Sequence, residues 1–473
     1  MTERHSGISR RFRCEGTETQ KGARPSRPGF ARLLFFASGD YGFNLYWQSM
    51  MLYLLFYYTE ALHLPITTAA WLYAIASVWD GVISLAIGLW VDRVPVVGRH
   101  CRTFMIGTIP LGLSFVLAYM PVPLTGNGIL WWVLGTHIAL RSFYALVNIP
   151  YLAMSARIST NEGDRALVAG VRMLSGTLAA MTVALGTVPL GQWLTGEQGA
   201  AAYSGAAVLF AIVATVLLIF VGLNYRDGME DAHKAPATLP LLVTIMAVLR
   251  NRAFLVLAGA MSAMIVAVTM VDKSVLYYFK YALGDEQAGH LALGLMMAVS
   301  GLAIPLCLLF TRRFGARRLW FAAAALGAVN LLLFVFGDMS IVASAQIFLV
   351  VMQVAIVGQS FVLWALLPRT IDHGERNLGV RADAATYGLV ALLQRLGIGM
   401  GTLMLGYILG HEGLKNSFAH TIASETGLRL GIALVPLFFF LLAGLIMLAY
   451  PVRGAGRDDR HPADAPAVSR PEA

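Results

Sequence analysis

The sequence predicts an all-α membrane protein with twelve transmembrane helices arranged in two six-helix bundles. Of its 473 residues, 58% are hydrophobic and only 13% are charged, whereas soluble domains carry about 25% charged residues. Apolar runs of roughly 20 residues, each long enough to cross a bilayer, recur along the whole chain. The net charge of +9 sits mostly in loops and tails, where it sets topology, so we expect no nucleic-acid partner.

The first 30 residues are polar and rich in Arg, Pro and Gly, which predicts a disordered cytoplasmic tail. They do not form a signal peptide, because the apolar run that follows is too long and lacks a cleavage site. Twelve spans are then predicted at residues 32–58, 68–91, 103–121, 128–153, 168–191, 203–223, 251–279, 290–311, 318–336, 341–367, 385–410 and 428–451.

Basic residues predict the orientation of these spans. Every even-numbered turn carries arginines, as in Arg93, Arg99 and Arg102 after span 2, whereas the turns 3–4, 5–6 and 9–10 have neither Lys nor Arg. Short cytoplasmic loops carry an excess of positive charge. We therefore expect even-numbered turns and both termini in the cytoplasm, and a multi-pass protein of a bacterial inner membrane.

A polar stretch from Asn224 to about Pro240 divides the spans into six and six. The predicted parts are an N-terminal bundle over 31–223, a cytoplasmic linker over 224–250, a C-terminal bundle over 251–453 and a disordered cytoplasmic tail over 454–473. The motif Asp92-Arg93 followed by Gly98-Arg99 after span 2 is echoed by the arginine-rich turn after span 8. Such parallel repeats predict a substrate site between the halves, near mid-membrane.

Two of the first spans carry acids in otherwise apolar helices. Span 1 contains Asp40, Asn44 and Gln48, which share one helical face, and span 2 contains Asp80 and Ser84, one turn apart. A buried charge in a membrane is a functional-site hypothesis, and an acid beside a hydroxyl can bind Na⁺ or H⁺. The alternatives are a polar helix–helix seam for Asp40 and a structural ion pair for Asp80.

Span 4 carries His137, Arg141, Tyr144 and Asn148 on one face. A guanidinium this deep in the membrane needs a carboxylate, and Asp40 or Asp80 is the expected partner. If that pair is permanent, the acid is structural and the cation-site hypothesis weakens.

Further polar residues lie in the later spans. Arg172 in span 5 is either functional or a snorkelling arginine. The adjacent Asp272 and Lys273 in span 7 are interpreted as a topology or surface feature. Arg395 in span 11 is expected to donate to the substrate or to act as a mobile counter-ion. Span 10 supplies the candidate lining residues Gln353, Gln359 and Trp364.

The sequence contains no phosphate-binding Gly-Lys-Ser/Thr loop, no CxxC and no HExxH, and its histidines are scattered. We therefore expect no enzyme and no cofactor beyond a coupling ion, H⁺ or Na⁺. A membrane enzyme would need a clustered nucleophile or metal set, and a sensor or scaffold would usually add a soluble domain.

Taken together, these motifs resemble the glycoside–pentoside–hexuronide:cation symporters of the major facilitator superfamily, typified by the melibiose permease. The resemblance covers all twelve spans. It is carried by Gly39-Asp40, Tyr57-Tyr58-Thr59-Glu60, Trp79-Asp80, Gly88, Asp92-Arg93, Gly98-Arg99, Pro110, Asn148-Ile149-Pro150-Tyr151, Arg165, Arg172, Tyr277-Tyr278-Phe279, Ile371-Asp372-His373-Gly374-Glu375 and Arg381.

The resemblance implies roles for individual residues. Asp40 matches an acid that binds sugar hydroxyls or joins the cation site, and Asp80 matches a cation-site acid. Arg395 matches a Lys that links the sugar and cation sites. The positions that match sugar-contacting or cavity-lining residues are Tyr144, Asn148, Arg172 and Trp364.

Three departures from the family pattern bear on the substrate and the coupling ion. Ser84 stands where sodium users place a second acid, which favours H⁺ coupling or an uncoupled facilitator. Asn148 replaces an acid, and Leu152 replaces an aromatic residue near the sugar. With Arg141, Arg172 and Arg395 near the cavity, an anionic substrate such as a hexuronide is the resulting hypothesis.

The sequence thus predicts a monomeric secondary transporter that moves a sugar, glycoside or hexuronide-like solute through the lipid bilayer by alternating access. Asp80, with Asp40 and Ser84, is the predicted cation-coupling site. Cytoplasmic turns are expected to form latch ion pairs that involve Asp92, Arg93, Asp372 and Glu375. A carrier of a lipid-like or other non-sugar solute on the same fold and an uncoupled facilitator are the alternatives.

Overall fold

The computed structural model of the protein describes residues 29–93, 97–159, 161–225, 241–337, 339–379, 383–411 and 422–451. All regular secondary structure in these ranges is helical, and eleven of the described helices are long and apolar enough to cross a membrane. The predicted all-α membrane fold is therefore confirmed. Residues 1–28 of the predicted N-terminal tail, residues 226–240 of the predicted linker and the C-terminal tail lie outside the described ranges, and Phe30, predicted as the last residue of the tail, begins a helix.

The helices of the N-terminal half are α1 (Phe30–Ala37), α2 (Gly39–Leu52), α3 (Leu54–Glu60), α4 (Ile66–Arg93), α5 (Val97–Ala118), α6 (Gly128–Arg157), α7 (Glu162–Thr195) and α8 (Ala200–Leu223). Those of the C-terminal half are α9 (Leu241–Arg250), α10 (Arg252–Tyr281), α11 (Glu286–Phe314), α12 (Ala316–Phe336), α13 (Val342–Leu378), α14 (Asp383–His411) and α15 (Ile422–Leu448). The short helix α9 falls inside the stretch predicted as a linker.

The first predicted span is broken into the three helices α1, α2 and α3. The breaks fall at Ser38 and Tyr53, and Ser38 Oγ donates to the Phe35 carbonyl over 2.7 Å. A serine that bonds to a preceding carbonyl competes with the helical ladder and bends the chain. None of the three pieces alone is long enough to cross a bilayer, which is why eleven long helices are found rather than the twelve predicted.

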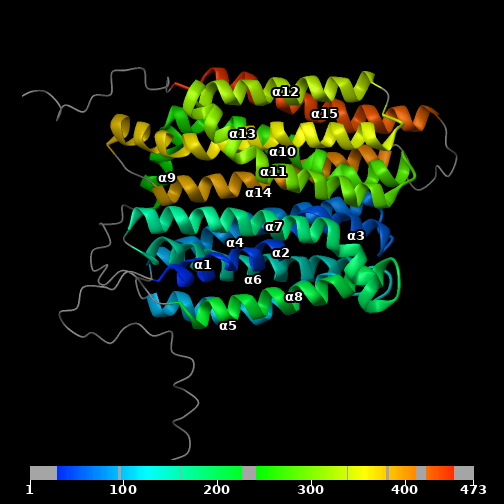
Figure 1. Ribbon diagram of the computed structural model, residues 1–473, viewed down its shortest axis with the longest axis horizontal. Helices are drawn as coiled ribbons and strands as arrows, with labels where there is room; N and C mark the ends of the chain where they lie inside the picture. Colours follow the sequence, from blue (N-terminus) through cyan, green and yellow to red (C-terminus); the bar gives the residue numbers. More distant parts are fainter. Residues whose placement is uncertain are drawn as a thin grey trace, which may run out of the picture.

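Figure 1 shows α1 to α8 in the lower half of the view and α9 to α15 in the upper half. Two antiparallel helix pairs join the halves, because α4 packs along α14 and α7 packs along α11. Glycines allow the close approach of α4 and α14. A Cβ atom placed on Gly406 would lie only 2.3 Å from the Cβ of Ala70.

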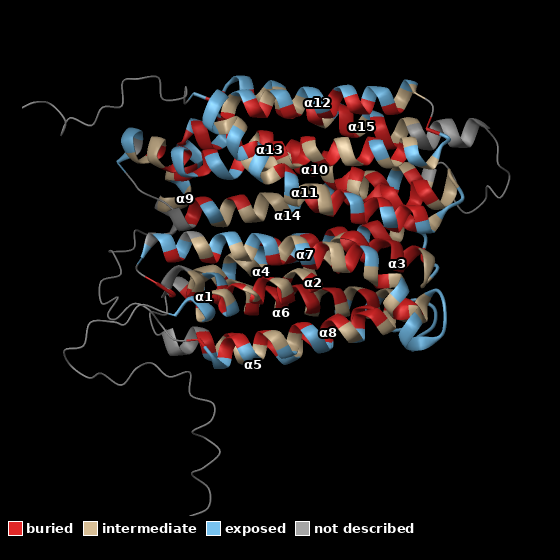
Figure 2. Cartoon of the chain, in the orientation of Figure 1, coloured by how far each residue is buried: buried red, intermediate tan, exposed pale blue. Residues whose placement is uncertain are grey.

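Buried side chains are concentrated toward the end of the molecule where α3 lies (Figure 2). Large apolar side chains are exposed along the long helices, among them Leu306, Phe336 and Leu445. In water such a surface would be costly, whereas in a bilayer it faces hydrocarbon. The exposure pattern is therefore that of a membrane-embedded helix bundle.

The helix α13 runs to Leu378, past the predicted end of its span at residue 367. Asp372 and Glu375 therefore lie on this helix and not in a turn, so the placement predicted from the sequence was wrong. Pro368 lies inside α13, and a transmembrane helix tolerates proline where neighbouring groups satisfy the freed carbonyl.

Candidate functional site

The centre of the candidate site is Asp80, which lies in the middle of α4 and is 0% exposed. Arg141 Nη1 donates to its Oδ2 over 2.9 Å. Arg395 Nε lies 2.8 Å from the same oxygen, in an ion pair that lacks hydrogen-bond alignment. Ser84 Oγ donates to Oδ1 over 3.2 Å. Of the two partners that the sequence allowed for Arg141, the structure selects Asp80.

Arg141 is itself fully buried and is fixed by groups on three helices. Its Nη2 donates to the hydroxyl of Tyr73 on α4 over 3.1 Å, and its Nε donates to His137 Nε2, one turn earlier on α6, over 3.2 Å. Its Cζ lies 5.3 Å from the ring centroid of Trp47 on α2. Because His137 accepts this hydrogen bond, its Nε2 carries no proton here. His137 therefore orients Arg141.

Arg395 comes from α14, so its contact with Asp80 joins the two halves of the chain. Its Cζ stacks 4.1 Å from the centroid of Trp47, and the ring of Tyr144 lies 5.6 Å from that of Trp47. Asp80 therefore contacts two guanidinium groups, and both are positively charged because arginine stays protonated in proteins. One carboxylate against two arginines leaves the cluster with a net charge of +1.

A second, partly buried ion pair joins Asp40 on α2 to Arg172 on α7. Arg172 Nη1 also donates to Ser155 Oγ over 3.1 Å, and its Cζ lies 5.3 Å from the ring centroid of Tyr151. The side chain therefore points into the protein and does not snorkel to an interface. The resemblance assigns Asp40 and Arg172 to sugar contact, and their ion pair places the two side chains next to each other. Contact of either residue with the solute stays a prediction.

In the described part of the structure, the hydrogen bonds and ion pairs of Asp80 do not include the remaining predicted site residues. Asn148 is half-buried on α6, whereas Trp364 on α13 is 50% exposed. Asp92 and Arg93 end α4, but their side chains lie outside the described part of the structure. The latch predicted for these two residues, Asp372 and Glu375 therefore stays a prediction.

The structure adds Lys273, Trp47 and Tyr73 to the centre of the protein. Lys273 is only 4% exposed and its Nζ lies 3.9 Å from the ring centroid of Tyr73, so its interpretation as a surface or topology feature was wrong. The error came from position, because Lys273 stands near the end of its predicted span. The signal that could have found it is a charge inside an apolar run.

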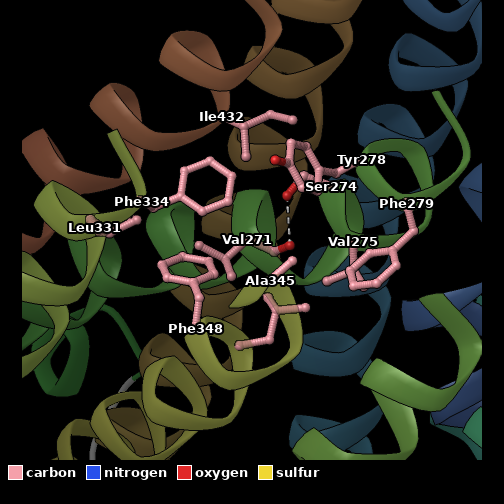
Figure 3. A pocket seen from close by; sticks show the side chains of 11 residues that line it. Val271, Ser274, Val275, Tyr278, Phe279, Leu331, Phe334, Ala345, Phe348 and Ile432 are labelled. Carbon is pink, nitrogen blue, oxygen red and sulfur yellow. Dashed lines mark hydrogen bonds between the residues drawn. The ribbon is translucent and has the colours of Figure 1, made fainter. Parts of the chain in front are cut away.

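An apolar cavity of about 20 Å³ lies within the C-terminal half, between α10, α12, α13 and α15 (Figure 3). Its walls are aliphatic and aromatic, and the serine in its lining, Ser274, donates to the Val271 carbonyl over 2.8 Å. A volume of this size holds one water molecule at most. The cavity is therefore a packing gap and not the solute site.

Comparison with known proteins gives the family. The sequence pattern of the family described as MFS/sugar transport protein matches residues 35–454. The glucuronide carrier protein homolog of Escherichia coli (strain K12) is 27% identical, over 88% of this chain and 91% of the relative. The isoprimeverose transporter of Lactiplantibacillus pentosus is 23% identical, over 88% of each chain. A putative sulfoquinovose importer of Salmonella typhimurium (strain LT2) is 26% identical, over 86% of this chain and 87% of the relative.

Among solved structures, the nucleoside transporter NupG superimposes with a TM-score of 0.66 at 13% identity, over 90% of this chain and all of that one. A bacterial homolog of the human lysosomal transporter Spinster, crystallised inward-facing and unoccupied, gives a TM-score of 0.63 at 14% identity, over 89% of this chain and 96% of that one. These likenesses show the fold. The family match covers nearly the whole chain, so the protein is a multi-pass membrane transporter of the MFS/sugar transport family and not an enzyme.

Proposed function

We propose that the protein is a proton-coupled symporter of an anionic sugar-type solute that works by alternating access. In this proposal α1, α2 and α3 together form the first of twelve crossings, in two six-helix bundles. It would act as a monomer in a bacterial inner membrane, with both termini in the cytoplasm. Two similar chains, from Bacillus subtilis and Escherichia coli, are named symporters, which supports coupled transport.

The observation that carries the choice of an anionic solute is the excess of guanidinium charge around Asp80. Arg141 and Arg395 face a single carboxylate in the middle of the protein. A buried charge without a partner is costly, so a bound anion would complete the neutralisation. Glucuronides carry a carboxylate and sulfoquinovose carries a sulfonate, and the relatives named for them fit this reading.

Arg395 is the guanidinium best placed to meet the solute. It is partly exposed, whereas Arg141 is completely enclosed. Its flat face already rests on Trp47, a geometry that leaves the edge of the guanidinium free to form paired hydrogen bonds with a carboxylate or sulfonate. We assign Asp80 as the counter-ion that holds Arg395 when no solute is bound.

The ligands around Asp80 favour a proton over sodium as the coupling ion. Sodium is a hard cation that prefers several oxygen ligands. Among the described residues, Ser84 supplies the hydroxyl next to Asp80, and the other contacts of the carboxylate are guanidinium groups. Such a site is poor in oxygen ligands for a metal cation. Cation binding by Asp80 itself would require one of its arginines to leave.

The halves are tied together at the end of the molecule where Glu60, Lys280, Tyr281 and Glu286 lie, here called the Glu60 end. Lys280 Nζ on α10 donates to Glu60 Oε2 on α3 over 2.7 Å, and Tyr281 donates to Glu60 Oε1 over 2.8 Å. These contacts are consistent with a conformation closed at the Glu60 end, which is the extracellular side in the predicted topology.

Substituting Glu60 with Gln is expected to shift the protein toward a conformation open at the Glu60 end. The change removes the carboxylate that links α3 to Lys280 and Tyr281 across the halves, and a ligand-free equilibrium moves with the lost contact energy. The readout is the labelling rate of a cysteine placed at Phe56, one turn inside this end, where the native ring packs against Tyr277 on α10. We expect a rise of at least severalfold over the same cysteine in the otherwise unchanged chain.

Glu286→Gln is the matched control for this experiment. Glu286 also contacts Lys280, at 3.4 Å, but both residues belong to the C-terminal half. Removing its carboxylate leaves the link from Glu60 intact, so labelling should change little. Equal labelling in the two variants would contradict a closing role for Glu60.

The proposed function is tested by solute-driven proton movement in proteoliposomes that contain the wild-type protein. Glucuronides, a sugar sulfonate and neutral glycosides are offered in turn, with a pH dye inside the vesicles and Na⁺ present or absent. We expect an anionic sugar to enter together with protons, without a need for Na⁺. Transport of neutral glycosides alone would refute the anionic solute, and solute entry without protons would indicate a facilitator.

A further inference from the structure

The break between α2 and α3 places a buried lysine against a free backbone carbonyl. The last turn of a helix leaves carbonyl groups without helical partners, and α2 ends at Leu52. The Met50 carbonyl accepts from the Tyr73 hydroxyl over 3.1 Å, and the Met51 carbonyl accepts from Lys273 Nζ over 2.9 Å. Lys273 stands on α10, so this hydrogen bond crosses between the halves of the chain.

Lys273 is a buried amine that forms no ion pair with a carboxylate in the part of the chain that the structure describes. Its own helix offers Asp272, but the Oδ1 atom of that residue is buried without a hydrogen-bond partner. From α4 the ring of Tyr73 faces it, at 3.9 Å from Nζ to the centroid. Behind Tyr73, on α6, stand Arg141 and His137.

These neighbours favour the neutral amine over the ammonium whenever no anion is near. Burial away from water disfavours the charged form of a lysine, and a neighbouring cation such as Arg141 disfavours it further. The Met51 carbonyl, the Tyr73 ring and the adjacent Asp272 favour the ammonium, whereas burial and Arg141 oppose it. Lys273 can therefore change its charge, whereas Arg141 and Arg395 cannot, because arginine is not deprotonated in proteins.

We propose that Lys273 is the residue that carries the coupled proton, a role that rests on the proposed function. Separation of the halves at the Glu60 end would pull α10 from α2 and bring the Lys273 amine into contact with water, where it binds a proton. A solute anion at Arg395 neutralises the nearby positive charge and so stabilises the ammonium. Once the solute leaves on the opposite side, the uncompensated positive charge around Arg141 repels the ammonium and the proton follows.

This scheme forms and breaks one N–H bond per cycle and moves one proton with one monovalent anion, so the transport step is electroneutral. Coupling arises because solute and proton each improve the site for the other, as linkage requires. The structural alternative is that Lys273 stays protonated and only caps the Met51 carbonyl. The two cases differ in whether a permanently charged side chain can replace the lysine without loss of proton movement.

The test compares Lys273→Arg, which keeps a charge that cannot be lost, with Lys273→Met, which has none. Reconstituted variants are assayed for exchange of the transported anionic sugar and for solute-driven proton movement. We expect both to retain exchange and to lose at least tenfold in the number of protons moved per solute. Ser274→Ala, one residue along and facing the small apolar cavity, is the control and should keep the wild-type ratio.

A second measurement does not depend on turnover. Addition of the sugar to purified protein in weakly buffered detergent solution should take up protons with the wild type and none with Lys273→Arg. A wild-type proton count in either assay with Lys273→Arg would overturn the role of Lys273. Exchange by the wild type without any proton movement would refute proton coupling, and the role of Lys273 with it, while sugar transport itself would stand. Absence of exchange with every sugar tested would instead refute the proposed function.

Discussion

Asp80→Asn is expected to lower the unfolding midpoint of the purified protein more than any other single substitution in the Asp80 cluster. The change leaves the fully buried Arg141 and the partly exposed Arg395 without the carboxylate that both contact. Removal of one partner from a buried ion pair costs about 3–5 kcal/mol, because the remaining charge is left uncompensated. Thermal unfolding in detergent, followed by intrinsic fluorescence, measures the shift.

The double variant Asp80→Asn/Arg141→Gln should recover part of this loss, since it removes one of the two uncompensated charges. Such recovery is the signature of coupled residues. Ser84→Ala serves as the control because it removes only one hydrogen bond to the same carboxylate, at 3.2 Å, and hydrogen bonds to charged groups contribute about 1.5–3 kcal/mol. If Asp80→Asn destabilised no more than Ser84→Ala, the ion pairs seen here would not hold the helices together.

Arg395→Gln is expected to reduce the preference for an anionic over a neutral sugar by roughly 10- to 100-fold. Hydrogen bonds to a charged group contribute about 1.5–3 kcal/mol, and 1.4 kcal/mol corresponds to tenfold in affinity. The glutamine keeps a donor but loses the charge. Competition of unlabelled glucuronides and neutral glycosides against a labelled solute, in an exchange assay, gives the ratio.

In the same assay, Arg395→Lys tests whether the charge or the planar shape of the guanidinium determines the preference for an anionic sugar. It keeps the positive charge near Asp80 but loses the planar contact with Trp47 and the paired donors of the guanidinium. We expect an intermediate preference for the anion. An equal loss for charged and neutral sugars in Arg395→Gln would show that this arginine supports the fold and does not select the solute.

The sequence was sufficient for the fold class, because hydrocarbon imposes a simple requirement on composition. A helix that crosses the bilayer needs about 20 apolar residues, and such runs are visible without any knowledge of packing. The same requirement made Arg141 conspicuous and implied a carboxylate partner, which the structure identifies as Asp80. The motifs also gave the family, which the match over residues 35–454 confirms.

Local interruptions were harder to predict than the spans. The first span is apolar enough to cross the bilayer, yet it breaks at Ser38 and Tyr53. A hydropathy profile reports only the length and polarity of a span. It cannot show that a helix ends early because side chains from other helices bind its last carbonyls, as the Tyr73 hydroxyl on α4 binds the Met50 carbonyl. In the opposite direction, the predicted span ends at residue 367, whereas α13 continues to Leu378.

By itself the sequence determined which residues share a helical face, because that relation follows from a spacing of three or four residues. Ser84 with Asp80 and His137 with Arg141 are contacts of this kind. Only the tertiary structure decided that Arg395 meets Asp80, that Arg172 meets Asp40 and that Lys273 reaches the Met51 carbonyl. These partners lie far apart in the chain, and they meet because α14 packs on α4, α7 on α2, and α10 near the α2–α3 break.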